Sequence, residues 1–238
     1  MTKEQFAEAL AAQGISLTDR QKEQFDQFFR LLVEWNEKMN LTGITEEGQV
    51  YIKHFYDSIT PAFYFPFDQV KSVVDIGGGA GFPSIPLKIC FPHLKMTIID
   101  SLNKRMSFLQ HVASELGLED VHPVHGRAED RGQEAGYREQ FDLVVARAVA
   151  RLNLLAEFCL PFAQPKGHFI ALKGADITTE LNEAKKAIKT LGGKTRKVET
   201  FQLLEGAGER NIVIIEKIEA TPKNYPRKAG VPAKKPLV

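Results

Sequence analysis

Short apolar runs alternate with amphipathic stretches along the chain after about residue 70. Seven of these runs have the length and composition of strands: Ser72–Ile76, Lys95–Asp100, Val121–His125, Phe141–Ala146, His168–Lys173, Thr195–Leu203 and Asn211–Lys217. The segments between the first five runs are long enough for crossover helices, notably Lys104–Leu116 and Leu152–Phe162. Alternation of strand and helix predicts parallel βαβ units with right-handed crossovers. We therefore expect a doubly wound α/β fold with a mostly parallel, seven-stranded sheet.

The last part of this pattern differs from the rest. Glu180–Leu191 predicts an amphipathic helix that ends at Gly192 and Gly193. Only the short, glycine-containing link Glu205–Arg210 joins the two closing runs. A link of this length predicts a hairpin, so we expect the final strand to be antiparallel.

The chain before the first strand has a helical pattern. Large apolar side chains recur every three or four positions at Phe25, Phe28, Phe29, Leu32 and Trp35. Thr18 is a suitable N-cap for this helix, with Asp19 in its first turn. We interpret the aromatic stripe as a packing face. The expected organisation is a helical extension over residues 1–66, a main domain over 67–218 and a basic tail over 219–238.

The bulk composition is that of a soluble globular protein. The chain has 238 residues, of which 43% are hydrophobic and 26% charged. The N-terminus has no apolar segment typical of a signal peptide, and charged residues interrupt the most apolar stretch, Phe141–Ala163. The two cysteines, Cys90 and Cys159, lie in apolar surroundings without a CxxC pattern. We expect a cytoplasmic protein without disulfides.

Charge is unevenly distributed along a chain whose net charge is only +1. The segment after Lys217 contains five cations and one acid: Lys223, Arg227, Lys228, Lys234, Lys235 and Glu219. A basic end of this kind often contacts nucleic acid, and the alternative is a solvated tail.

A glycine-rich loop follows the first predicted strand, at Gly77, Gly79 and Gly81. Glycines let the backbone turn sharply and approach a ligand closely, and the helix that follows offers unpaired N–H groups. The dinucleotide fingerprint G-x-G-x-x-G would need a third glycine where Phe82 stands. Asp75, just before the loop, would repel a pyrophosphate but can hold the ammonium group of an amino acid. This chemistry favours S-adenosylmethionine over NAD.

Two further acidic positions fit an adenosine-containing cofactor. Asp100 ends the second predicted strand, where a carboxylate can accept hydrogen bonds from both ribose hydroxyls. Its alternatives are a surface acid or a cap of the next helix. The acidic turn after the third strand can receive the adenine, with the backbone of Ala128 and Glu129 beside the base edge.

Motifs spread over nearly the whole chain point to one family. They are Trp35–Thr42, His54-x-x-Asp57-Ser58, the loop Asp75–Pro86, Lys104-Arg105, Ala146-Arg147-Ala148, Leu172-Lys173-Gly174 and Tyr225-Pro226-Arg227-Lys228-x-Gly230-x-Pro232. With these motifs the chain resembles the glucose-inhibited division protein B family, class I methyltransferases that use S-adenosylmethionine to modify guanine N7 in 16S ribosomal RNA of the small subunit. Gly43, Gly78 and Ser84 depart from common family residues without altering a charge.

The resemblance implies a cofactor, a substrate and a set of contacts. The cofactor is S-adenosylmethionine, and the partner is 16S ribosomal RNA or the small ribosomal subunit. The implied cofactor contacts are Gly77, Phe82, Ala128, Glu129 and Arg147. Asp75, Gly79 and Asp100 join this set from the analysis of the loop and strand ends.

Guanine N7 methylation does not require a catalytic base. N7 has a lone pair and no proton to lose, so the rate would come from holding the reacting atoms in line, an effect worth up to about 7–11 kcal/mol. Directly after the fourth strand the chain has no Asn-Pro-Pro-Tyr-type motif and no cysteine in its place, which fits N7 chemistry. We expect no metal site, because no cluster has metal-ligand spacing.

Arg147, at the end of the fourth strand, is a candidate positioning residue. The methylated product is cationic, so an arginine placed at N7 would oppose the reaction. We expect Arg147 to bind the cofactor's carboxylate or an RNA phosphate, or to donate to guanine O6. The alternative is a strand-end arginine paired with an acid.

The candidate RNA contacts are Arg105, Lys173, Arg227 and Lys228. Phosphate contacts by such residues give an affinity that falls with salt. A solvated lysine is the alternative for Lys173. His54 and Asp57, three residues apart, are expected to form a local pair.

Three other functions stay open. The chain could methylate a small molecule or a protein, could be an NAD-dependent oxidoreductase, or could bind S-adenosylmethionine without catalysis. We expect a monomer, since no exposed apolar repeat calls for a partner.

Overall fold

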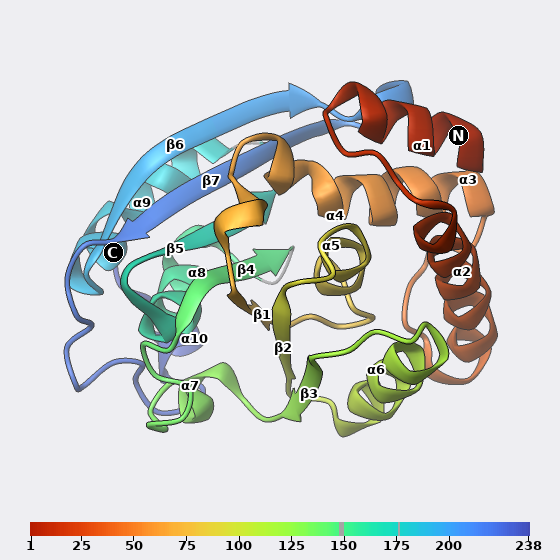
Figure 1. Cartoon of the computed structure of the whole chain (residues 1–238). Coiled ribbons are helices and arrows are strands. Elements are labelled where there is room, and N and C mark those ends of the chain that lie inside the picture. Colours follow the sequence, from red (N-terminus) through yellow and green to blue (C-terminus); the bar gives the residue numbers. More distant parts are fainter. Residues whose placement is uncertain (148–149, 176) are drawn as a thin grey trace.

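The computed structural model describes residues 1–147, 150–175 and 177–238. Seven strands form one sheet in the order β3-β2-β1-β4-β5-β7-β6 (Figure 1). The strands are β1 (Ser72–Ile76), β2 (Lys95–Asp100), β3 (Val121–His125), β4 (Phe141–Arg147), β5 (Ala163–Lys173), β6 (Gly193–Gln202) and β7 (Glu209–Lys217). The predicted doubly wound, mostly parallel sheet of seven strands is confirmed.

Helices surround the sheet and form the N-terminal region. They are α1 (Lys3–Ala12), α2 (Asp19–Met39), α3 (Glu47–Val50), α4 (Asp57–Ile59), α5 (Ser84–Cys90), α6 (Asn103–Glu115), α7 (Ala128–Arg131), α8 (Leu152–Cys159), α9 (Ile177–Thr190) and α10 (Val231–Lys234). The expected final antiparallel strand is also confirmed, since β7 is antiparallel to both of its neighbours. It lies between β5 and β6, so β6 forms the edge of the sheet.

The two faces of the sheet carry separate hydrophobic cores, because successive side chains of a strand point to opposite faces. Val73 of β1 belongs to a core that contains side chains of α5, α6 and the N-terminal helices. Val74, the next residue, belongs to a core that contains side chains of α8 and α9. Figure 1 shows this arrangement, with α8 and α9 on one side and α5 and α6 on the other.

The aromatic stripe of α2 packs inward, as the spacing predicts. Thr18 caps the helix in a capping box with Gln21. Phe28 is fully buried and stacks on Phe55 at 5.3 Å between ring centroids. Trp35 lies 5.5 Å from Phe108 of α6. The first core is therefore continuous from the extension into the main domain.

The extension also contains a π-helical stretch. Tyr51–Tyr56 lies between α3 and α4 in one helical run. Such stretches are rare and occur frequently at functional sites. Here the stretch carries Lys53 and His54 toward the end of β4.

The C-terminal segment folds back onto the main domain. The Arg138 guanidinium donates to the carbonyls of Thr221 and Tyr225 at 2.7 and 2.6 Å. Gln133 donates to the carbonyl of Pro226 at 2.7 Å. Residues 219–238 are thus tied to the domain by hydrogen bonds. In the described part of the chain, no helix has the length and apolarity needed to cross a membrane.

We predict that Phe55 links the stability of the extension to that of the sheet. Phe55→Ala should cost about 3–5 kcal/mol of unfolding free energy, because a fully buried aromatic side chain is lost from the shared core. Urea denaturation would measure this loss as one cooperative transition. Phe29→Ala, at a half-buried position of the same extension, is the control and should cost clearly less. Separate transitions for the extension and the sheet would contradict a continuous core.

Candidate functional site

A cavity opens where the strand order reverses, at the carboxyl ends of β1, β2 and β4. Open α/β sheets bind ligands at this position. The cavity has a volume of about 490 Å³. Its walls include six predicted cofactor-binding residues: Gly77, Gly79, Asp100, Ala128, Glu129 and Arg147. The structure thus brings together positions from four separate segments of the chain, and we call this space the first cavity.

The glycine loop adopts a conformation that favours glycine. Gly77 and Gly79 have φ angles of 75° and 58°, in the left-handed region. The Gly77 N–H donates to the carbonyl of Ile99 at 2.8 Å, which joins the loop to β2. The loop therefore presents backbone rather than side chains to the first cavity.

Asp75 lies beneath the loop and is not part of the cavity wall. Its side chain is completely buried, and Oδ2 accepts a hydrogen bond from the Ser84 N–H at 3.3 Å. Oδ1 has no hydrogen-bond partner among the described residues. Burial raises the pKa of this carboxyl to about 7, and the hydrogen bond from Ser84 offsets part of the shift.

Asp100 faces the first cavity from the end of β2. Its Oδ2 accepts hydrogen bonds from the Gly79 N–H at 3.1 Å and from Arg105 Nη1 at 2.9 Å. Its Oδ1 accepts one from the Leu102 N–H at 2.9 Å. A carboxylate has about four acceptor positions. Asp100 therefore keeps capacity for a further donor, although Arg105 already pairs with it.

Glu129 connects the first cavity to the C-terminal segment. Its Oε1 accepts a hydrogen bond from the Gly230 N–H at 3.1 Å. Gly230 and Ala233 also line the cavity. The sequence analysis missed both residues as part of the site, and the only available signal was that Gly230 belongs to the tail motif.

Phe82 packs in the core beside the first cavity. Its ring stacks on His54 at 4.6 Å and lies 5.4 Å from Phe28. The Arg147 guanidinium carbon lies 4.9 Å from the ring centroid. Phe82 is only 6% exposed and does not line the cavity. The Phe82 ring thus packs against the Arg147 guanidinium from the side of the hydrophobic core.

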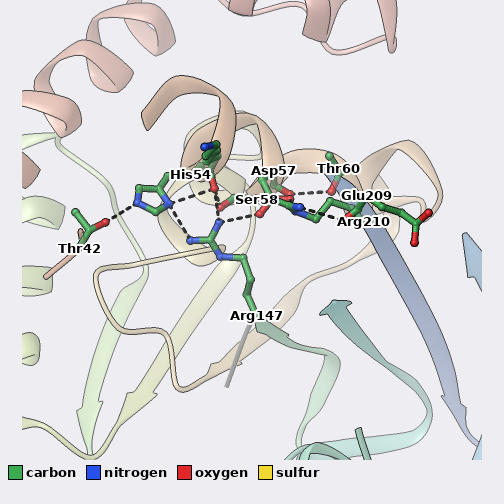
Figure 2. A network of polar contacts seen from close by, with 9 residues as sticks. Thr42, His54, Asp57, Ser58, Thr60, Arg147, Glu209 and Arg210 are labelled. Atoms are coloured by element: carbon green, nitrogen blue, oxygen red, sulfur yellow. Dashed lines mark hydrogen bonds and ion pairs between the residues drawn. The ribbon is translucent and has the colours of Figure 1, made fainter. Parts of the chain in front are cut away.

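Arg147 reaches from β4 into the extension and is held there by three groups (Figure 2). Its Nη1 donates to the Lys53 carbonyl and to Asp57 Oδ2, both at 3.1 Å. Its Nη2 lies 3.4 Å from His54 Nδ1. Asp57 Oδ1 accepts a second ion pair at 2.9 Å from Arg210 of β7. One carboxylate of the extension therefore joins the arginines of two strands.

The local pair expected between His54 and Asp57 is wrong. His54 Nε2 lies 2.7 Å from Thr42 Oγ1, and both His54 and Asp57 contact Arg147 instead. Burial, together with the charge of Arg147, lowers the pKa of His54 to about 4. His54 is consequently neutral at physiological pH and adds no second charge beside Arg147.

A second cavity adjoins the first, and Arg147 lines both of them. It has a volume of about 320 Å³ and lies between the π-helical stretch and the ends of β5 and β7. His54, Asp57, Lys173 and Arg210 contribute to its walls. Sequence analysis named Arg147 and Lys173 individually but gave no reason to expect a cavity between them.

The four candidate RNA contacts differ in their surroundings. Lys173 is paired with Glu180 at 2.8 Å, and Arg105 with Asp100. Arg227 donates to both oxygens of Glu157, a side chain that is only 1% exposed, at 2.8 and 2.6 Å. Lys228 is exposed, and the described residues offer its side chain no polar partner.

Among the described residues, no group of three His, Cys, Asp or Glu side chains is placed to hold a metal ion. The family motif Ala146-Arg147-Ala148 runs beyond the described residues at Ala148. Its first two members end β4.

Comparisons with known proteins agree on one family. Residues 21–213 match the family model described as GidB, rRNA small subunit methyltransferase G. The chain is 92% identical to the ribosomal RNA small subunit methyltransferase G of Brevibacillus brevis, over the full length of both chains. It is 59% identical to the protein of the same name from Staphylococcus aureus strain Newman, over 100% of this chain and 99% of the relative.

Solved structures show the same fold at low sequence identity. The mitomycin 7-O-methyltransferase MmcR superposes with a TM-score of 0.56 at 17% identity, over 79% of this chain and 60% of that one. The Methanococcus jannaschii fibrillarin pre-rRNA processing protein gives a TM-score of 0.51 at 17% identity, over 65% of this chain and 70% of that one.

We predict that Asp75 makes the unfolding free energy depend on pH. Its folded-state pKa, about 7, lies above the ordinary value of 3.8, so its contribution is complete below about pH 4 and is lost as pH rises to about 7. Linkage limits this contribution to at most about 4 kcal/mol. Relative to wild type, Asp75→Asn should therefore gain stability across this range in urea denaturation. Asp68→Asn, at an exposed position, is the control. Parallel curves for wild type and Asp75→Asn would contradict a buried, protonated Asp75.

A further prediction concerns the contacts of Arg147. Arg147→Ala should cost about 3–5 kcal/mol of unfolding free energy, because the buried Asp57 carboxylate loses one of its two cationic partners. Arg151→Ala is the control, since Arg151 forms an exposed ion pair with Glu183, and it should cost about 0.5 kcal/mol or less. Equal costs for the two variants would mean that Arg147 has no structural role.

Proposed function

Since the chain belongs to the GidB family of rRNA small subunit methyltransferase G proteins, we propose that it transfers a methyl group from S-adenosylmethionine to N7 of a guanine in 16S ribosomal RNA. The structural observation that carries this proposal is the first cavity. It combines a backbone loop and the strand-end carboxylate of Asp100 at the reversal of strand order.

The walls of the first cavity fit this cofactor. Asp100 has acceptor capacity left for a ribose hydroxyl, and the backbone at Ala128 and Glu129 can meet the adenine. The loop at Gly77 and Gly79 leaves room for the amino-acid end. Two carboxylates, Asp100 and Glu129, line the cavity, and S-adenosylmethionine carries no phosphate. It supplies a methyl group on a positively charged sulfur.

The role proposed for Asp75 is electrostatic. Its Oδ1 is buried below the loop and has no hydrogen-bond partner among the described residues. An ammonium group bound above the loop would favour the ionised carboxylate, and Gly78 lies next to the Asp75 carboxylate. Asp75 therefore acts on the cofactor through the loop or through water.

For this reaction the protein has to position the reacting groups more than to transfer protons. Guanine N7 attacks with its own lone pair, so no side chain has to act as a base. Arg147 serves as a fixed wall, because Asp57 and the Lys53 carbonyl hold its guanidinium. Its contact with a buried carboxylate also reduces its repulsion of the cationic product. Phe82 supports the guanidinium from the core.

Deleting the C-terminal tail would not show whether the methyl acceptor is RNA, a protein or a small molecule. Gly230 and Ala233 line the first cavity, so deleting residues 219–238 would alter cofactor binding as well as any RNA contact. A substrate assay separates these possibilities directly.

We further propose that the enzyme is a monomer acting in the cytoplasm on 16S ribosomal RNA or the assembled small subunit, and that 1–66, 67–218 and 219–238 are its functional regions.

The proposed function is tested by methyl transfer to small ribosomal subunits from cells lacking the enzyme. Purified protein with radiolabelled S-adenosylmethionine should label the RNA, and borohydride and aniline cleavage should locate one N7-methylguanine. Absence of label in subunits and in free RNA, while the cofactor binds, would contradict the proposal. Label without aniline cleavage would move the methyl group to another atom.

Arg227 and Lys228 form a matched pair for testing RNA contact. Lys228→Ala should weaken RNA binding and reduce the slope of log affinity against log salt by about 0.7–0.9, the value for one phosphate contact. Arg227→Ala should instead lower the unfolding free energy, since the buried Glu157 carboxylate loses the Arg227 guanidinium. Filter binding across a salt series and urea denaturation measure the two effects. An unchanged salt slope for Lys228→Ala would exclude this phosphate contact.

A further inference from the structure

Among the described residues, the second cavity shares only Arg147 with the first cavity, and its other wall residues have no part in the proposed cofactor site. Ile44, Leu172 and Ile212 contribute apolar side chains, and His54 contributes its ring. His54 stacks on Phe82 and is therefore fixed in orientation. Apolar walls with a few fixed polar groups are typical of pockets for small, flat ligands.

In the described part of the chain, the lining of the second cavity has four cations and one carboxylate. Asp57 is shared between Arg147 and Arg210, and Lys173 is paired with Glu180. Lys53 is the other cation in the wall. Arg147, Arg210 and Lys173 are each already paired with a carboxylate. The cavity offers a base an apolar surface and, in Asp57, an acceptor for its N–H groups.

We propose that the second cavity receives the target guanine, unstacked from the RNA, and that Asp57 recognises its N1–H and N2 amino group. This inference rests on the proposed function and adds a base-selecting residue to it. Enzymes that modify bases commonly read an extruded base through its Watson–Crick edge. A carboxylate accepts from guanine N1 and N2, whereas adenine has an acceptor at N1 and no amino group at C2.

Asp57 has the capacity for these contacts. Its two oxygens receive one arginine each, Arg147 at 3.1 Å and Arg210 at 2.9 Å. A carboxylate offers about four acceptor positions, so two stay free for the base. The arginines fix the carboxylate in place, which a recognition acceptor needs.

Arg147 relates this base position to the cofactor. It lines both cavities, and guanine O6 and N7 share one edge of the base. A guanine whose O6 accepts from Arg147 therefore has N7 beside the wall between the cavities. Asp57 accepts hydrogen bonds from N1–H and the N2 amino group and leaves N7 free to react.

The test compares guanosine with inosine at the methylated position. Inosine lacks the N2 amino group but keeps N7, O6 and N1–H. After the target is mapped by cleavage, 16S RNA carrying either nucleoside at that position is assembled into small subunits. Wild-type enzyme should methylate the inosine subunit about 10- to 100-fold more slowly in single-turnover assays, the effect of one lost hydrogen bond to a charged group.

The Asp57→Asn variant tests whether Asp57 causes the difference in rate between guanosine and inosine. The variant should be slower on guanosine and should show a clearly smaller guanosine-to-inosine rate ratio than wild type, because Asn keeps only one, uncharged acceptor oxygen, while binding S-adenosylmethionine as wild type does. A change in subunit structure caused by inosine would persist in the variant. Asp26→Asn is the matched control, because Asp26 also joins two cations, Lys3 and Arg30, away from both cavities. It should keep the wild-type ratio.

Ile44→Trp provides a second test that leaves Asp57 intact. The larger side chain should fill the second cavity and abolish methyl transfer without changing cofactor affinity. Ile218→Trp, at an exposed position, should transfer at the wild-type rate. These two variants test the base pocket even if Asp57→Asn reacts too slowly with both RNAs for a guanosine-to-inosine rate ratio to be measured.

The outcomes separate this inference from the proposed function. Equal wild-type rates on guanosine and inosine, an unchanged ratio in Asp57→Asn, or full activity of Ile44→Trp would each overturn the base pocket while methyl transfer to guanosine stands. If wild-type enzyme methylates neither subunit, the proposed function itself fails.

Discussion

The contact of Asp57 with Arg147 and Arg210 is the interaction on which the rest of the site depends. The two arginines come from β4 and β7, and the carboxylate comes from the N-terminal extension (Figure 2). The partners are 90 and 153 residues apart in the sequence. The contact sets the wall between the two cavities, so the extension takes part in building the site as well as in packing.

Burying these charges is favourable only because the geometry is well satisfied. An isolated buried charge costs several kcal/mol. Arg147 meets a carboxylate and a backbone carbonyl, and its guanidinium lies over the Phe82 ring. His54 stays neutral beside it because burial and the arginine lower its pKa. The π-helical stretch at Tyr51–Tyr56 supplies the Lys53 carbonyl and the His54 ring, which links an unusual backbone segment to one function.

Local sequence patterns predicted the fold well because hydrophobic periodicity determines it. Ser72–Ile76 and Lys95–Asp100 were predicted with the bounds that β1 and β2 have. The place of β7 inside the sheet could not be predicted from its own residues, because strand order depends on long-range pairing. The glycine loop and Asp100 likewise had local signals.

Side-chain partners from distant segments were beyond prediction. The spacing of His54 and Asp57 indicated a local pair, whereas both contact an arginine about 90 residues further along. Arg227 and Lys228 were indistinguishable as neighbouring cations, and only the structure shows Glu157 beneath the first. The second cavity had no sequence signal, because residues from the N-terminal extension, β4, β5 and β7 meet to form it.

The central claim is that two cavities with separate occupants share Arg147 as a wall. A crystal structure of the protein with S-adenosylhomocysteine and guanosine tests it most directly. The account predicts the adenosyl group beside Asp100, the guanine beside Asp57, and Arg147 still bonded to Asp57 between them. Guanine outside the second cavity, or an Arg147 side chain turned away from Asp57 to bind the ligand, would contradict it.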